Sequence, residues 1–531
     1  MPKTIPTKTF VVLIILISFL FFGKTLNYEF VWDDELSHLT RHEDVMKGNL
    51  ANIWAKPYDG MYIPVTYTIW TGVKKFSYNK FKKELNPKLF HFTNILFHTS
   101  NSILVFLILM LLFKNSPAAF VGTLFFLLHP LQVESVAWVS EFRGVLSVFF
   151  SLLSIYVLLK NIDFFDSFKT VLRSRSFILA TLFYVLALLS KPSAVALPFV
   201  ALILIWAFYT NHFKTALKAI IIWFILFIPI LLLTSNSQTN EIMNFIVPIA
   251  QRPLVASYSI AFYFYKIILP FNLSACYGIT PETIIKGWEM YAALILTAGI
   301  FLFLFLKRSN YKILFTSYSI IVFSLLPVIG LVTFYYQRYS NVADRYMYFG
   351  MFGIALLIAH FWNKKFNNDY LKYALGVFLV IISFSSFYHL DTWKNEFTLW
   401  DNAMKQNPNQ WNAAYNRGVY YTKVGKSSEA IEDYTIALRY KPNDSKTLTN
   451  RANAYGMLNR YEEAIADYST ALKLNEKDAS IYYNRALTYY YMKNIKACSY
   501  DLQMAMRMGF KPDPQFVRAV KAELNIQFGS R

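Results

Sequence analysis

The sequence predicts an all-α protein, in which a polytopic membrane helix bundle of about 11 to 13 spans precedes a soluble α-solenoid of helical hairpins. Two observations predict this fold. Of 531 residues, 55% are hydrophobic and 16% are charged, whereas an ordinary soluble domain has roughly 25% charged residues. The C-terminal part repeats itself with a 34-residue period, which is typical of stacked helix pairs.

The membrane part is predicted from segments that approach the roughly 20 apolar residues needed to span a bilayer. The first follows Lys3 and Lys8, the charge order of a retained first helix. The twelve segments cover residues 9–23, 91–113, 117–138, 144–160, 176–190, 193–209, 216–233, 254–270, 289–306, 313–333, 346–362 and 373–390. We expect them to form one membrane domain, residues 1–390.

Basic turns between the segments predict sidedness, because Lys and Arg favour the cytoplasmic side. The turns at 160–175, 307–312 and 363–372 are expected on the cytoplasmic side. An N-terminus on that side places the first long loop, residues 24–90, on the outer side, and the basic turns of the second half place everything after Asp391 there as well. This requires an odd number of spans, so one span is missed or the segment near 241–252 is re-entrant.

The net charge of +20 could indicate a nucleic-acid partner. The Lys and Arg residues, however, lie in short runs between apolar segments, so the charge indicates membrane topology and the lipid bilayer as the partner. Cys276 and Cys498 lie in different regions, which argues against a disulfide framework or thiolate metal site.

Asn-Arg pairs mark the repeats, because Asn416, Asn450 and Asn484 each precede an arginine at the 34-residue step. This is the period of tetratricopeptide (TPR) repeats. The expected TPR domain, residues 391–531, divides into a half repeat 391–410, repeats 411–444, 445–478 and 479–512, and a capping helix 513–531.

Stacked TPR units present a concave face that binds extended peptides. The repeated asparagines could hold the backbone of an acceptor protein there. The alternative is that the Asn-Arg pairs make hydrogen bonds between repeats.

Asp33, Asp34 and Glu35 form three consecutive acids just after the first apolar segment. An acidic pair at a membrane surface can act as a general base or bind a divalent cation. The alternative is a solvated turn. No further ligand set accompanies these acids, so the sequence does not indicate a metal site.

Polar residues also mark the starts of the next segments. His91, Asn94 and His98 share one helix face, where packing or anchoring is favoured over metal binding. Glu134 follows His129-Pro130, and Glu141 and Arg143 come shortly after. These charged residues are expected near the first loop, either as a functional site or simply paired with one another.

Three cations complete the set of candidates. Lys191 lies between two apolar segments with hardly any loop around it, and Arg338 and Arg345 lie on the last outer loop. Such cations can bind the phosphate of a lipid carrier, and arginine does so with a bidentate fork. A lone lysine can also simply extend toward the headgroups.

Together these motifs resemble the transmembrane and TPR-repeat-containing O-mannosyltransferases and their bacterial relatives, of the GT-C glycosyltransferase superfamily. The likeness covers nearly the whole chain. It rests on Tyr28 to Glu35, Pro64 with Thr66, His91 with Asn94 and His98, His129-Pro130 with Glu134, Glu141 with Arg143, Lys191, and Asp344-Arg345 with Tyr348.

The resemblance implies a GT-C-like domain that transfers a sugar, mannose or a similar hexose, from a polyprenyl-phosphate donor to a protein hydroxyl. It implies that Asp33 or Asp34 is the catalytic base and that the basic residues Arg143, Lys191 and Arg345 neutralise the leaving phosphate. We expect Glu35, His91, Glu134, Glu141 and Arg338 to help bind the donor. It also implies a bacterial inner membrane, with the first loop and the repeats on the periplasmic side.

Two positions depart from the family pattern. Gly144 stands where relatives often carry an acid, and Ile63 stands where many carry an arginine. Either difference points to another sugar or acceptor. Two alternative functions remain open: a lipid-linked oligosaccharide ligase or polymerase, and a non-catalytic membrane scaffold that displays the repeats.

Overall fold

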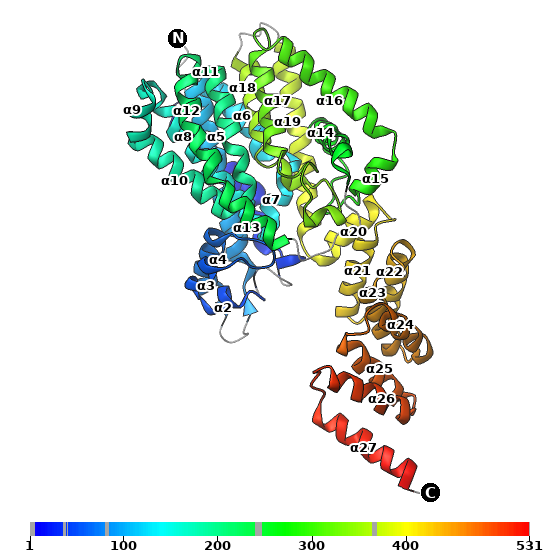
Figure 1. Ribbon diagram of the computed structural model, residues 1–531. Coiled ribbons are helices and arrows are strands. Elements are labelled where there is room, and N and C mark those ends of the chain that lie inside the picture. The colour runs from blue at the N-terminus through cyan, green and yellow to red at the C-terminus, as the bar shows by residue number, and fades with distance from the viewer. Residues whose placement is uncertain are drawn as a thin grey trace. The chain divides into compact units, whose positions relative to one another are not determined.

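The computed structural model describes residues 6–34, 39, 41–79, 84–238, 247–363 and 369–529. The chain forms two compact units, residues 1–399 and 400–531. Both are helical, and the predicted class, an apolar helix bundle followed by a TPR region, is confirmed (Figure 1).

The first unit contains most of the helices. They are α1 Thr7–Phe22, α2 Glu43–Lys47, α3 Leu50–Ala55, α4 Pro64–Ser77, α5 Pro87–Phe113, α6 Ser116–Leu128, α7 Val133–Ala137, α8 Phe142–Lys160, α9 Phe168–Arg173, α10 Arg175–Ser190, α11 Leu197–Phe208, α12 Phe213–Leu226, α13 Ile228–Gln238, α14 Arg252–Ile268, α15 Pro281–Lys286, α16 Glu289–Leu306, α17 Lys312–Leu325, α18 Met351–Asn363 and α19 Asp369–Leu390. Short 3-10 helices join several of them. Those used below are η3 Pro130–Gln132, η4 Val139–Glu141, η9 Tyr335–Arg338, η10 Asp344–Met347 and η11 Asp391–Trp393.

In the described residues, six helical segments are long and apolar enough to cross a membrane. They are Thr7–Asn27, Pro87–Phe113, Val139–Lys160, Thr210–Leu233, Glu289–Leu306 and Lys372–Trp393. A seventh is formed if Ser116–Leu128 and Pro130–Ala137, which meet at 56°, count as one broken span. The chain therefore has the helices of a multi-pass membrane protein.

The number of helices long enough to cross a membrane is smaller than the twelve apolar segments counted in the sequence. Several of those segments form helices that end before they reach a membrane-spanning length. Pro130 ends α6, since proline cannot continue the backbone hydrogen bonding. Four shorter apolar helices of 10–17 residues remain: Arg175–Ser190, Pro192–Phe208, Lys312–Leu325 and Met351–Asn363.

Small polar side chains join neighbouring apolar helices. On α8, Ser147 Oγ donates to the carbonyl of Ala187 at 3.0 Å and Ser154 Oγ donates to that of Ala180 at 2.7 Å, both on α10. Such hydrogen bonds replace the hydrophobic driving force that lipid cannot supply between helices. They fix α8, and hence the residues at its N-terminus, against α10.

The first loop folds around its own apolar cluster, which includes Phe30, Val45, Ile53, Ile63 and Trp70. Its helices α2, α3 and α4 lie together at one end of the bundle (Figure 1). A two-stranded antiparallel pair, β1 Tyr78–Asn79 with β2 Glu84–Leu85, leads back to α5.

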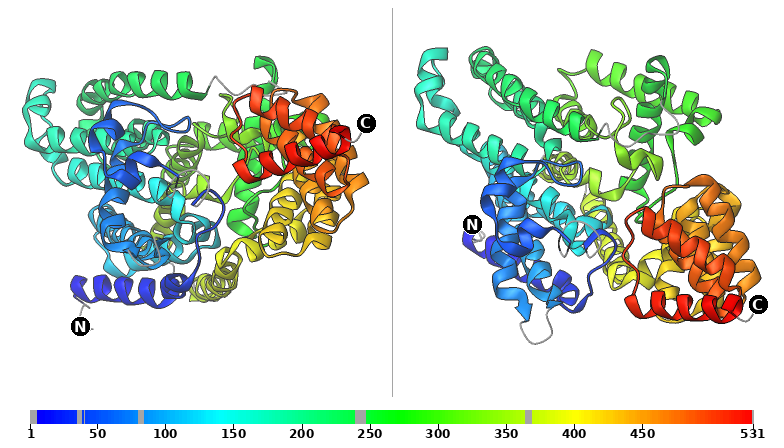
Figure 2. Two further views of the ribbon diagram at one scale, coloured as in Figure 1. Left: turned by 90° about the horizontal axis from the view of Figure 1, so that it is seen from below. Right: turned by 60° about the horizontal axis from the view of Figure 1, so that its bottom comes forward.

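The second unit stacks helix pairs in succession, from yellow to red in Figure 2. After α20 Glu396–Gln406, which begins in the first unit, come α21 Trp411–Lys423, α22 Ser427–Tyr440, α23 Ser445–Met457, α24 Tyr461–Leu474, α25 Ala479–Tyr491, α26 Ile495–Arg507 and α27 Pro514–Gly529.

Asp444 and Asp478 cap α23 and α25 by accepting backbone N–H bonds, as N-cap carboxylates do. At Gly418 a Cβ would lie 2.7 Å from the Tyr434 ring, so only glycine permits this approach of α21 to α22.

The arginines of the Asn-Arg pairs stabilise the stack. Arg451 forms a bidentate pair with Asp467 at 2.7 and 2.9 Å and donates to Thr435 of the preceding repeat at 3.0 Å. Arg417 forms the same bidentate pair with Asp433 and donates to Asp401 in the preceding half repeat. Arg485 forms it with Asp501 and donates to Ser469 in the preceding repeat. The inter-repeat alternative is therefore correct for the arginines. Asn450 and Asn484 also donate to side chains of the preceding repeat, Tyr415 at 3.2 Å and Asn453 at 3.3 Å.

Candidate active site

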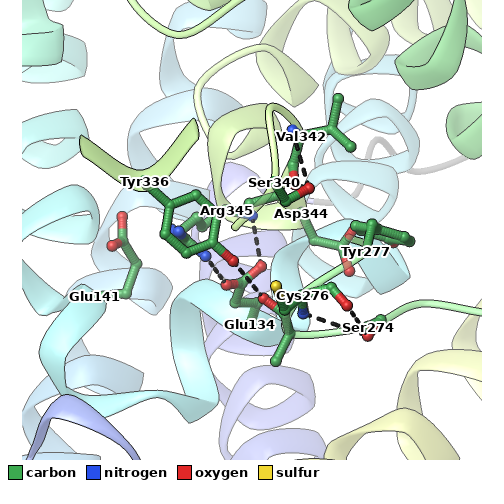
Figure 3. Close-up of polar contacts among 12 residues, drawn as sticks. Glu134, Glu141, Ser274, Cys276, Tyr277, Tyr336, Ser340, Val342, Asp344 and Arg345 are labelled. Atoms are coloured by element: carbon green, nitrogen blue, oxygen red, sulfur yellow. Dashed lines mark hydrogen bonds and ion pairs between the residues drawn. The ribbon is translucent and has the colours of Figure 1, made fainter. Parts of the chain in front are cut away.

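Five segments distant in the sequence meet at one end of the membrane unit. They are the turn at Trp32–Asp34, the stretch from His129 to Arg143, Lys191, the loop at 274–279, and the loop at 335–345. Figure 3 shows Glu134, Tyr277, Tyr336, Asp344 and Arg345 converging from these segments. Most of the charged residues singled out in the sequence lie here.

Asp34 fixes the first loop to the bundle. Its Oδ1 accepts hydrogen bonds from the backbone N–H of Ser140 at 2.7 Å and from Ser140 Oγ at 2.5 Å, and its Oδ2 accepts from the N–H of Val31 at 3.1 Å. Complete burial raises the pKa of Asp34 to about 7, and these donors oppose the rise. With its oxygens used in this way, Asp34 holds the turn in place.

Asp33 is the more accessible of the two acids, because its side chain is only partly buried. Burial raises its pKa to about 6, the charges of Arg143 and Arg345 lower it, and the Asp59 carboxylate raises it. A carboxyl group with a pKa near 6 suits general base catalysis close to neutral pH.

Glu141 binds two cations. It forms an ion pair with Lys191, and its Oε2 lies 3.4 Å from Nε of Arg143. The side chains of Lys191 and Arg143 keep 19% and 11% exposure, whereas that of Glu141 keeps 1%. Both cations are thus held by a buried carboxylate while part of each remains open to a ligand.

Glu134 binds Arg345 twice. Its Oε1 pairs with the guanidinium, and its Oε2 accepts the backbone N–H of Arg345 at 2.9 Å (Figure 3). Buried charges are stable only when paired and hydrogen-bonded. Glu134 and Glu141 therefore each pair with a cation of a distant segment, Arg345 and Lys191, and Glu141 also pairs with the nearby Arg143.

Aromatic rings enclose the Arg345 guanidinium. Its centre lies 4.3 Å from the Tyr336 ring centroid, 5.0 Å from that of Tyr346, 5.4 Å from that of Trp138 and 5.9 Å from that of Trp32. Trp32 and Trp138 are stacked, with centroids 4.7 Å apart. These cation–π contacts orient Arg345 beside the Asp33 turn.

Trp32 has a left-handed backbone, with φ of 56°. A non-glycine residue in this conformation costs about 1–3 kcal/mol unless its surroundings hold it there. Stacking on Trp138 supplies that constraint and fixes the backbone directly before Asp33.

Three predicted donor-binding residues lie elsewhere or outside the described part. Glu35 lies outside the described residues. His91 is fully buried and packs edge-on against Tyr28. Arg338 is exposed, and its guanidinium lies over the rings of Tyr335 and Tyr339.

The neighbours of His91 have structural roles. Asn94 donates to the carbonyls of Val136 and Trp138, at 3.2 and 3.0 Å. His98 bonds to the Tyr348 hydroxyl at 2.7 Å and to the Leu127 carbonyl at 3.1 Å. This helix face anchors α5, as the sequence favoured. No group of three or more His, Cys, Asp or Glu in the described residues is arranged to hold a metal ion.

The two departures from the family pattern have different surroundings. Ile63 is buried in the apolar cluster of the first loop. At Gly144 a Cβ would collide with the Glu141 carboxylate and lie 3.1 Å from Nζ of Lys191. The ion pair of Glu141 and Lys191 thus occupies the space that a side chain at position 144 would need.

Several neighbours of the site were not among the candidates selected from the sequence. Asp59 lies on the turn Tyr58–Met61, and its charge acts on Asp33. Tyr277 donates to Asp344 at 2.6 Å beside Arg345. No motif or spacing indicated these residues, although Asp59-Gly60 is a recognisable turn signal.

An apolar groove of about 730 Å³ lies among α14, α16, α17 and α18. Phe264, Ile267, Ile300, Tyr318 and Ile354 are among its lining residues. The carbonyl of Ile267 also bonds to His129 at 3.1 Å, so this wall is tied to the segment that carries Glu134.

The fold and the site together define a multi-pass membrane protein with a TPR domain and a cluster of buried acids and cations. The TPR repeat family model matches residues 457–492. Protein O-mannosyl-transferase F38B6.6 of Caenorhabditis elegans is 22% identical over 450 residues, 80% of this chain and 62% of that protein. Protein O-mannosyl-transferase TMTC1 of Homo sapiens is 25% identical over 493 residues, 80% of this chain and 54% of that protein.

The chain is thus a distant homologue of these O-mannosyltransferases and spans a little over half their length. Among solved structures, the APC/C hetero-tetramer Cut9–Hcn1 matches 91% of this chain at 13% identity and a TM-score of 0.24. A score this low carries no argument about function.

Proposed function

We propose that this protein is a membrane glycosyltransferase that moves a hexose, mannose or a similar sugar, from a polyprenyl-phosphate carrier to a protein hydroxyl. The observation that carries the proposal is Asp33, a partly exposed acid with a pKa near 6 that lies among cations suited to a phosphate. The distant O-mannosyltransferase relatives support the same reaction class.

In the proposed reaction, Asp33 takes the proton of the acceptor hydroxyl. The hydroxyl oxygen forms a bond to the anomeric carbon of the sugar, and the bond between that carbon and the phosphate oxygen breaks. The electron pair of the broken bond stays on the polyprenyl phosphate. Arg143 and Lys191, each partly exposed beside Glu141, stabilise the negative charge that develops there.

The remaining polar residues position these groups. Asp34 fixes the turn through Ser140, and Glu134 with the aromatic rings holds Arg345. The apolar groove suits the isoprenoid chain of the donor, since it is lined almost wholly by hydrocarbon side chains.

The repeat domain, residues 391–531, recruits the acceptor protein in this proposal, and residues 1–390 carry the chemistry. Asn450 and Asn484 remain partly exposed on the first helices of their repeats and can bind a peptide backbone. The first loop and the repeats lie on the periplasmic side of a bacterial inner membrane.

Substitution of Asp33, with Asp59 as the control position, tests the proposal. The purified full chain in lipid nanodiscs is supplied with a polyprenyl-phosphate-linked sugar and an acceptor protein, and intact mass is measured. We expect Asp33→Asn to lower transfer by about 10²–10⁴-fold. Asp59→Asn is the matched control and should keep most of the activity.

Wild-type transfer by Asp33→Asn would refute the proposed base. Intact masses of envelope proteins from cells with and without the gene would identify the sugar and the acceptor together. If no protein mass differed, protein glycosylation would be excluded.

A further inference from the structure

Three indole rings form a continuous stack that ends at the segment leading to the repeats. Trp32 stacks on Trp138 with centroids 4.7 Å apart and planes at 10°, and Trp138 stacks on Trp393 at 5.9 Å and 25°. Trp138 and Trp393 are each 1% exposed. All three belong to the first unit, so the stack joins the Asp33 turn to the last apolar helix of the bundle.

Polar contacts run beside the stack. The hydroxyl of Tyr28 donates to Asp391 Oδ1 at 2.8 Å, and Lys24 Nζ lies 3.1 Å from the same oxygen. The backbone N–H of Glu29 donates to the carbonyl of Lys394 at 3.0 Å. We name residues 391–394 the tether, because α20 begins two residues later and continues into the repeat unit.

These contacts involve the segment that carries Asp33. Tyr28 and Glu29 precede it in the same stretch of chain, and Trp32 is its neighbour. Trp138 in turn lies under the guanidinium groups of both Arg143 and Arg345, at 5.8 and 5.4 Å. A shift of the tether therefore moves one wall of the site, together with the acid and the cations that the reaction uses.

We infer that Trp393 and Asp391 are positioning residues for Asp33: the tether holds the catalytic turn through the indole stack and the Tyr28 hydrogen bond. The inference rests on the proposed function and deepens it. Neither residue need touch a substrate, yet the distance between Asp33 and its cations depends on both. The tether thereby joins the membrane site to the acceptor-recruiting repeats.

The test uses the purified full chain in nanodiscs and compares Trp393→Leu with Trp393→Phe. Leucine keeps an apolar side chain without a planar ring, whereas phenylalanine can still stack. We expect Trp393→Leu to lower kcat by about tenfold to a hundredfold, the scale for small misplacements of catalytic groups, with donor KM nearly unchanged. Trp393→Phe should recover most of the rate.

Two further readouts separate positioning from folding. The acid limb of the pH–rate profile should shift in Trp393→Leu, because Asp33 moves relative to Arg143 and Arg345. The exciton signal that stacked indoles give in circular dichroism should weaken in the same variant, because the Trp138–Trp393 pair is lost while the Trp32–Trp138 pair remains. Trp288→Leu, at an indole that is 73% exposed, is the matched control and should change neither.

If Trp393→Leu does not fold, Tyr28→Phe removes only the hydroxyl that binds Asp391 and should lower kcat in the same direction. A wild-type kcat and pH profile in Trp393→Leu, with the exciton signal weakened, would overturn the inference, and so would a wild-type kcat in Tyr28→Phe. Asp33→Asn in the same assay distinguishes a failure of this inference from a failure of the proposed function. If that variant stays active, the proposed function fails instead.

Discussion

At the scale of single residues, two adjacent aspartates have different surroundings and therefore different roles. Asp34 is fully buried and bound by Ser140 and Val31, whereas Asp33 is partly exposed and faces cations. The sequence could select the pair but could not distinguish its members, because the partner Ser140 lies 106 residues away in the chain.

The raised pKa of Asp33 predicts a pH dependence. A base must be deprotonated to accept a proton, so the rate should fall as the pH drops through about 6. Asp59→Asn removes a negative charge that raises this pKa, so the acid limb should move to lower pH. The measurement is kcat/KM against pH for wild type and Asp59→Asn. An unchanged limb would show that another group controls it.

Gly144 offers a second test at this scale. Gly144→Ala places a Cβ against the Glu141 carboxylate and near Lys191, so it should break or displace that ion pair and lower transfer by about tenfold or more. Gly376→Ala is the matched control, since nothing lies within 4 Å of its added Cβ. Equal activities of the two variants would mean that the Glu141–Lys191 pair is not needed for transfer.

At the scale of elements, the sequence predicted the repeats well and the ends of the apolar helices less well. The 34-residue period placed each Asn-Arg pair at the same position of its repeat, whereas the binding of each arginine to the aspartate 16 residues later is visible only in the structure. Pro130, in contrast, lies inside the apolar segment 117–138, which the sequence predicts to be one span, and it breaks that segment with a 56° bend because proline cannot continue the helical hydrogen bonding.

The arginine ladder predicts the stability of the repeats. Arg451→Lys loses the bidentate fork to Asp467 and the bond to Thr435, and should destabilise its helix pair by about 1–3 kcal/mol, the range for charge-assisted hydrogen bonds. Hydrogen exchange of α23 and α24 in the full chain measures the effect. The exposed Arg439→Lys is the control, and faster exchange in both variants would contradict a specific role for the ladder.

At the scale of the whole molecule, the site could be predicted only in part. Spacing and residue type selected Asp33, Glu141, Arg143, Lys191 and Arg345, because ionisable residues beside apolar helices are costly and draw attention. They did not select Trp393, whose contact with Trp138 forms only when the last apolar helix packs against the segment after the first one.

The proposed division of labour, with chemistry in the membrane unit and acceptor recruitment by the repeats, predicts a kinetic separation. Asn450→Ala combined with Asn484→Ala should raise KM for a protein acceptor several-fold and leave kcat nearly unchanged, because the chemistry lies elsewhere in the chain. Gln503→Ala, at an exposed position of α26, is the control. A fall in kcat alone would argue against recruitment by these asparagines.

In the proposed function, the isoprenoid chain of the donor lies in the apolar groove among α14, α16, α17 and α18, and this placement determines how the donor is supplied. A ligand held there arrives by lateral diffusion within the bilayer, whereas the acceptor arrives from water. The relevant donor concentration is therefore its mole fraction in the membrane. With the total amount of donor held constant, adding inert phospholipid should slow transfer because it lowers the mole fraction of donor in the membrane. Diluting the sample with buffer at a constant lipid composition should change only the rate of encounter with the acceptor.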